Sequence, residues 1–101
     1  MATMIHHLVM LRWKPTTSPE TQCQLAGKLL ALKEVIPEVR AIATGVNKDP
    51  ESAKEWPFVL EVQVDDLAAL QRYTDHPAHQ AVVKELREAR EARLAVDLDV
   101  R

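Results

Sequence analysis

Residues 4–14 read MIHHLVMLRWK, and this stretch decides the fold. In a β-strand, successive side chains point to opposite faces of the sheet, so the stretch carries two sets of side chains. The two sets are Ile5, His7, Val9, Leu11 and Trp13 on one face, and Met4, His6, Leu8, Met10 and Arg12 on the other. Both are largely apolar, whereas a strand with one face in water alternates between apolar and polar residues. We therefore predict a strand with material packed on each side.

The region that follows has the pattern of an amphipathic helix. Ser18 suits the N-cap, Pro19 suits the first helical position, and Glu20 is favourable at the positive end of the helix dipole. Apolar residues then recur at helical spacing and form a stripe along one side: Leu25, Leu29, Leu32 and Ile36. Pro37 is predicted to end this helix.

The remainder of the chain alternates between strand and helix patterns. Residues 56–65 place their large apolar side chains on one face: Phe58, Leu60, Val62 and Val64. Pro77 suits the first turn of a helix with an apolar stripe of His79, Val82, Val83 and Leu86. The charged side of that helix is predicted to be solvated: Lys84, Glu85, Arg87, Glu88 and Glu91. The predicted elements are a strand at 39–46, a loop at 47–52, a strand at 56–65, helices at 67–73 and 78–93, and a strand at 94–100.

The order of these elements, β-α-β-β-α-β, predicts an α+β ferredoxin-like fold. In this fold a four-stranded antiparallel sheet carries both helices on one face. At 101 residues the chain fits one domain, 1–101, because two independent cores would each be too small. The other face of the sheet would expose Leu8, Met10 and Val59, so we predict that a second copy covers it in a homodimer.

Composition argues against several classes of function. The net charge is −2 and the basic residues are dispersed, which disfavours nucleic-acid and membrane-surface binding. No run approaches the roughly 18 apolar residues that span a bilayer. Cys23 is the only cysteine and the N-terminus lacks the pattern of a secretory signal, so we expect a cytoplasmic protein. With only Gly27 and Gly45 in the chain, a glycine-rich phosphate loop is excluded.

Two histidines are predicted to meet between the sheet and the helices. His7 shares a strand face with Val9 and Leu11, and Phe58 belongs to the face of the third strand that should meet the helices. His79 lies on the inward stripe of the last helix. His7 and His79 are therefore expected to approach each other, with Tyr73 as a neighbour.

The stretches MIHHLVMLRWK, LEV at 60–62 and YTDHPAH at 73–79 resemble the stress-responsive dimeric α/β-barrel (Dabb) family over nearly the whole chain. The resemblance implies a ferredoxin-like protomer and a homodimer whose sheets form a barrel. One branch of the family resembles polyketide cyclases, which close a ring by intramolecular aldol condensation. Its catalytic positions would match Tyr73, His79 and, on the first strand, His7. That branch has a further histidine on the third strand, where this chain has Phe58, which puts cyclase activity in doubt.

The chemistry of such a reaction suits these residues. Removing a proton next to a carbonyl needs a base with a pKa near neutrality, such as an imidazole, and a donor such as the Tyr73 hydroxyl for the developing oxyanion. Alternatively, His79 is a core histidine whose hydrogen bonds go to Tyr73 or to the first strand, and His76 serves the helix start. Metal binding at His76, His79, His7 and Asp75 is permitted by the spacing, but structural zinc usually has cysteine ligands, and we predict no metal and no cofactor.

Three functions remain open at this stage. The first is a dimeric protein that binds a small apolar or carbonyl-bearing molecule, with Phe58, Trp13, His76 and Val83 as candidate ligand-binding residues. The second is a cofactor-free lyase or cyclase that uses His79 and Tyr73. The third is an interaction module whose pocket is filled by Phe58, Leu86 and Trp13. A cavity between His7 and His79 would favour the first two functions.

Overall fold

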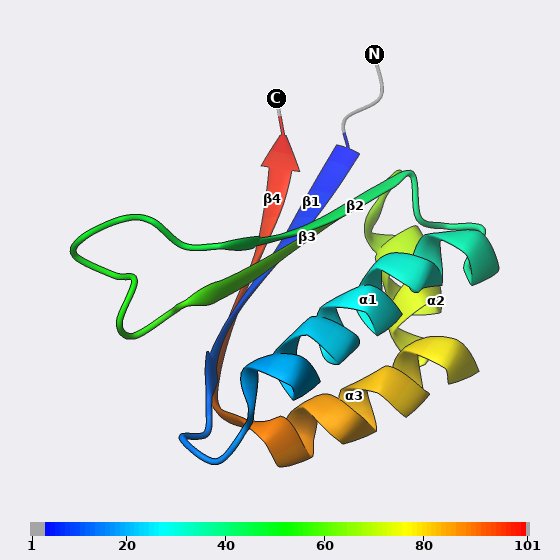
Figure 1. Cartoon of the computed structure of the whole chain (residues 1–101). Coiled ribbons are helices and arrows are strands. Elements are labelled where there is room, and N and C mark those ends of the chain that lie inside the picture. The colour runs from blue at the N-terminus through cyan, green and yellow to red at the C-terminus, as the bar shows by residue number, and fades with distance from the viewer. Residues whose placement is uncertain (1–3, 101) are drawn as a thin grey trace.

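The computed structural model describes residues 4–100, and seven elements follow one another along this part of the chain (Figure 1). They are β1 (Met4–Trp13), α1 (Pro19–Val35), β2 (Ala41–Val46), β3 (Phe58–Val64), α2 (Leu67–Asp75), α3 (Pro77–Ala89) and β4 (Arg90–Val100). The predicted order of strands and helices is confirmed. None of the helices in residues 4–100 is both long and apolar enough to cross a membrane.

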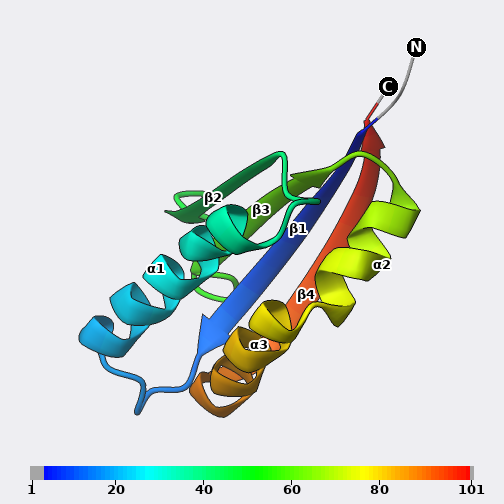
Figure 2. The same ribbon diagram turned by 90° about the vertical axis from the view of Figure 1, so that its right-hand side faces the viewer.

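The strands form one antiparallel sheet in the order β2-β3-β1-β4. β1 lies between β3 and β4, so that His7 is opposite Val62 on one side and Asp97 on the other. All three helices lie on the same face of the sheet (Figure 2). This is the predicted ferredoxin-like arrangement, in which the second helix of the fold is divided into α2 and α3.

The hydrophobic core lies between the sheet and the helices. Every second residue of β1 is buried, beginning at Ile5, and the same alternation begins at Phe58 in β3. The helix α1 contributes the predicted stripe of Leu25, Leu29 and Leu32, with Ile36 directly after it. Truncating one of these buried leucines to alanine is expected to cost about 2–5 kcal/mol.

Side-chain caps begin α1 and α2, at the predicted Ser18 and at Asp66. The Ser18 hydroxyl accepts a hydrogen bond from the Thr21 N–H at 3.1 Å, and the Asp66 carboxylate accepts one from the Ala69 N–H at 2.7 Å. These bonds satisfy N–H groups that have no partner within the helix. Because the caps fix where α1 and α2 start, they also fix which side chains face the sheet.

The predicted end of the last helix, residue 93, is wrong. The helix α3 ends at Ala89, and Arg90 is already extended, with φ −100° and ψ 151°. The ladder with β1 continues back to Arg90, which is opposite Trp13, so residues 90–93 pair with β1 instead of continuing the helix. No glycine or proline marks this boundary in the sequence. As a result, Arg90 and Arg93 belong to β4.

The face of the sheet opposite the helices carries a row of exposed apolar side chains. The partly buried Leu8, Met10 and Val59 lie on this face, as predicted from their parity. The strand β4 adds four exposed residues: Leu94, Val96, Leu98 and Val100. We call this set the open face. No element of residues 4–100 covers it (Figure 2).

Candidate functional site

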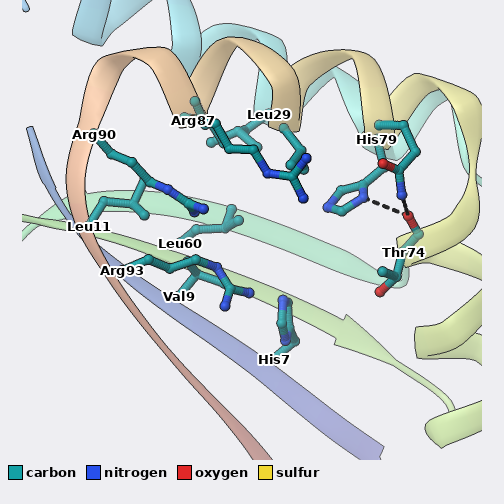
Figure 3. Close-up of a pocket in the computed structure, with 13 residues that line it drawn as sticks. His7, Val9, Leu11, Leu29, Leu60, Thr74, His79, Arg87, Arg90 and Arg93 are labelled. Carbon is teal, nitrogen blue, oxygen red and sulfur yellow. Dashed lines mark hydrogen bonds between the residues drawn. The ribbon is translucent and has the colours of Figure 1, made fainter.

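A cavity of about 270 Å³ lies between the sheet and α3 (Figure 3). Its size is near the lower end of the roughly 300–1,000 Å³ that is typical of ligand pockets. Side chains of β1, β3, β4 and all three helices contribute to its wall. The lining residues are His7, Val9, Leu11, Leu29, Leu60, Thr74, His79, Gln80, Val83, Leu86, Arg87, Arg90 and Arg93.

His7 stands on the sheet side of the cavity. It is buried, and the β1–β4 register places it opposite Asp97, whose carboxylate accepts a hydrogen bond from His7 Nδ1–H at 2.5 Å. This bond fixes the imidazole tautomer and leaves Nε2 as the other polar atom of the ring. Asp97 therefore fixes the orientation of the His7 ring at the cavity wall.

His79 stands on the helix side, in the first turn of α3. Its Nδ1–H donates to the Thr74 carbonyl at 2.9 Å, and the ring extends from α3 toward the middle of the cavity (Figure 3). Burial lowers the pKa of His79, the Thr74 bond opposes this effect, and the nearby His7 and Arg93 lower the pKa further. The neutral imidazole is thus favoured, with Nε2 as a free acceptor and potential base.

Tyr73 packs near both histidines but does not line the cavity. Its ring centroid lies 4.5 Å from that of His79 and 6.3 Å from that of His7. Its side chain is fully buried, and within residues 4–100 its hydroxyl has no hydrogen-bond partner. Burial raises the pKa of Tyr73, so the hydroxyl stays protonated. The predicted neighbours His7, Tyr73 and His79 therefore lie together, although only the histidines reach the cavity wall.

The four candidate ligand-binding residues have different positions. Val83 lines the cavity. Trp13 and Phe58 pack against each other in the core, with ring centroids 5.2 Å apart, and neither is among the lining residues. His76 also lies outside the lining, because its Nδ1 accepts the Ala78 N–H and caps α3. Trp13 and Phe58 thus act as packing residues and His76 as a capping residue.

The three arginines of the lining were not among the predicted site residues. The sequence predicts that Arg87 lies on the solvated side of its helix, and Arg87 is exposed in the structure, whereas it predicts Arg90 and Arg93 at the end of that helix. In the structure all three side chains line the cavity together with His7 and His79 (Figure 3). The sequence does contain three arginines at regular spacing, Arg87, Arg90 and Arg93. That spacing indicates a shared cavity only when β4 is known to begin at Arg90.

Residues 4–100 contain no group of three or more histidine, cysteine, aspartate or glutamate side chains that could hold a metal ion. Within the proposed histidine set, His76 Nδ1 is engaged with the Ala78 N–H and His79 Nδ1 with the Thr74 carbonyl. The polar chemistry of the cavity therefore consists of two imidazoles, three guanidinium groups and the adjacent polar side chains of Thr74 and Gln80.

A family model described as the stress responsive A/B barrel domain, Dabb, matches residues 5–100. The chain belongs to the Dabb family. The ferredoxin-like fold described above agrees with this match. No curated protein matches the Dabb chain described here.

Solved structures show the same fold. A dimeric ferredoxin-like protein of unknown function from Jannaschia sp. is 29% identical, with 96% of this Dabb chain and 99% of that chain covered and a TM-score of 0.84. Another from Thermobifida fusca is 26% identical, with 99% and 93% covered and a TM-score of 0.85. A hydroxynitrile lyase from Passiflora edulis is 17% identical, with 100% and 96% covered and a TM-score of 0.89. At this identity the lyase is similar in fold alone.

Proposed function

We propose that this Dabb protein is a homodimer that binds a small carbonyl-bearing molecule in the cavity between His7 and His79. The observation that carries the proposal is the pair of imidazoles, each held at Nδ1 and each lining the same cavity. A few polar groups that converge on a cavity with apolar walls are typical of ligand sites. A carbonyl compound fits because an imidazole can exchange a proton with its oxygen or with its acidic C–H.

The alternative of a filled pocket has less support. Trp13 and Phe58 would have to occupy the space between the histidines, but they pack against each other in the core. Leu86 lines the cavity and does not fill it. The remaining volume of about 270 Å³ favours a bound molecule over an interaction module that is closed by its own side chains.

Homodimerisation is supported by the open face and by the relatives. The exposed Leu94, Val96 and Leu98 form a continuous apolar row with the side chains of β1, and such rows usually mark an interface. The relatives from Jannaschia and Thermobifida are described as dimeric. Sedimentation analysis of the full chain at micromolar concentration should give the mass of a dimer, and a stable monomer would contradict the proposal.

Ligand binding can be tested by NMR with two neutral carbonyl compounds, acetophenone and methyl phenylpyruvate. We expect them to shift the resonances of His79 and Val83. The variant His79→Gln should lose these shifts. His6→Gln is the matched control because His6 lies on β1 beside His7 but faces away from the helices. Shifts of equal size in His79→Gln, or none in the parent protein, would contradict binding in this cavity.

A second candidate function is proton transfer in a lyase or aldol cyclase. Its specific support is the state of His79, since the bond to Thr74 leaves Nε2 as the acceptor and burial favours the neutral base. Tyr73 is the candidate donor, because its hydroxyl is protonated, lacks a partner within residues 4–100 and belongs to a ring packed on His79. Since Tyr73 does not line the cavity, this role requires its hydroxyl to reach the substrate by a local movement of the ring.

Deuterium exchange at the methylene carbon of methyl phenylpyruvate tests this second function. A positioned base typically accelerates proton transfer by about 10²–10⁴-fold, so the parent protein should exchange the methylene protons much faster than His79→Gln. His6→Gln should retain the parent rate. Equal exchange rates in the parent and in His79→Gln would exclude proton abstraction by His79 while leaving the binding proposal intact.

A further inference from the structure

The arginines of residues 4–100 fall into two groups. Outside the cavity, each arginine is paired with a carboxylate: Arg12 with Glu91 at 3.6 Å, Arg40 with Asp65 at 2.7 Å and Arg72 with Glu38 at 3.0 Å. The other three, Arg87, Arg90 and Arg93, all line the cavity. Within residues 4–100, none of these three forms an ion pair with a carboxylate.

The unpaired arginines come together because α3 ends where it does. Arg87 lies in the last turn of α3, Arg90 begins β4, and Arg93 lies on the helix side of β4, opposite Leu11. Three like charges in one cavity repel one another. Burial lowers the pKa of Arg90, and the nearby Arg93 and Arg87 lower it further. A bound anion would relieve this repulsion.

We propose that Arg87, Arg90 and Arg93 form an anion subsite and that the ligand of this Dabb protein is a small organic carboxylate. Its charged end lies at the arginines and its carbonyl end lies toward His7 and His79. This inference rests on the proposed binding function and names the chemical class of the ligand. The planar guanidinium group matches a carboxylate because it can donate two parallel hydrogen bonds to it.

The remainder of the lining favours an organic anion over a free inorganic one. Beside the arginines and the histidines, much of the wall is apolar: Val9, Leu11, Leu29, Leu60, Val83 and Leu86. Inorganic phosphate would satisfy the arginines but would leave this wall without apolar contacts. A hydrocarbon body between a carboxylate and a carbonyl contacts the whole cavity, whose volume of about 270 Å³ restricts the ligand to a small molecule.

The test compares phenylpyruvate with its methyl ester, which has the same skeleton but no charge. Calorimetric titration of the full chain should show that the acid binds at least about tenfold more tightly than the ester, since charge-assisted bonds are about twice as strong as neutral ones. The variants Arg90→Gln and Arg93→Gln should each weaken acid binding by about tenfold and change ester binding little.

Arg72→Gln is the matched control. It removes the same charge from an exposed arginine whose partner, Glu38, lies outside the cavity, so acid binding should be unchanged. Equal affinity for acid and ester, unaffected by the cavity variants but lost in His79→Gln, would overturn the anion subsite and leave the binding proposal standing. Inorganic phosphate binding as tightly as phenylpyruvate would overturn the organic carboxylate. Binding of neither organic probe would overturn both proposals.

Discussion

The neighbours His6 and His7 lie on opposite faces of one sheet, and the two faces are incomplete in different ways. His7 faces the helices, is buried and bonds to Asp97 beside the cavity. His6 lies on the open face, where its Nδ1 is 3.5 Å from the Glu61 carboxylate. On the helix-covered face, packing leaves a space bounded by charged groups. On the open face, apolar side chains remain in contact with solvent.

The difference indicates two kinds of partner. A cavity with convergent polar groups suits a small molecule, whereas an extended apolar row suits another protein surface. The helix-covered face is itself only partly filled by side chains. Trp13 and Phe58 pack together in the layer between sheet and helices, whereas a cavity remains where His7 and His79 face each other's side of this layer.

The largest expected effect comes from placing a charge on the open face. In the proposed dimer, Val96→Asp would bury a carboxylate among apolar side chains of both copies. We expect a weakening of at least about 3 kcal/mol, which raises the dimer dissociation constant by about two orders of magnitude. Sedimentation at several protein concentrations measures this shift.

Val46→Asp is the control for that substitution. Val46 is also an exposed strand valine, but it is opposite Phe58 in β2–β3 and therefore has the parity of the helix side. The control should remain as dimeric as the parent protein. If both variants dissociate equally, or if Val96→Asp stays dimeric, the open face is not the interface.

The sequence predicted the two faces because alternation is a local property. The parity of β1 and β3 placed His7 toward the helices and Met10 away from them, and the structure agrees. The inward position of His79 likewise followed from the spacing of apolar residues on α3. Such patterns reflect which side chains leave water, and they do not depend on the exact ends of the elements.

The charged end of the cavity could not be predicted in the same way. Its arginines depend on where α3 stops and β4 begins, and pairing with β1 decides that boundary across a large separation in sequence. The same limit applies to Trp13 and Phe58, since cross-strand packing determines which end of the layer is filled. The pattern of apolar residues along the chain predicts which face of an element is buried. It does not predict the contacts between elements that are distant in sequence.

A smaller effect is expected from removing the Tyr73 hydroxyl. Tyr73→Phe deletes a buried polar atom that has no partner within residues 4–100 and keeps the ring that packs on His79. Because an unsatisfied buried group is unfavourable, we expect the free energy of unfolding to rise by about 1 kcal/mol. Urea denaturation measures this change. A loss of stability of similar size would mean that the hydroxyl has a partner in solution, such as bound water.

The same variant separates the two candidate functions on the covered face. If the cavity only binds its ligand, Tyr73→Phe should leave the affinity for methyl phenylpyruvate nearly unchanged, because Tyr73 does not line the cavity. If Tyr73 donates a proton in catalysis, the variant should lose deuterium exchange while it keeps both fold and affinity.

The smallest expected effect is a pH dependence of stability that originates at His79. Its pKa in the folded protein lies below the ordinary value of 6.5, mainly because of burial. The unfolded chain therefore takes up a proton at a higher pH than the folded protein does, and the contribution of His79 to stability is lost as the pH falls below about 6.5. Above that pH the contribution is fully present.

Urea denaturation between pH 5 and pH 8 measures this dependence, which is expected to be modest because the ring is only partly buried. His79→Gln should flatten the profile in this interval, whereas His6→Gln should leave it unchanged because His6 lies on the open face. Phenylpyruvate provides a further test. Its carboxylate would counter the charge of Arg93, which lowers the pKa of His79, so binding should raise that pKa toward its ordinary value. NMR titration of the imidazole with and without phenylpyruvate measures this change.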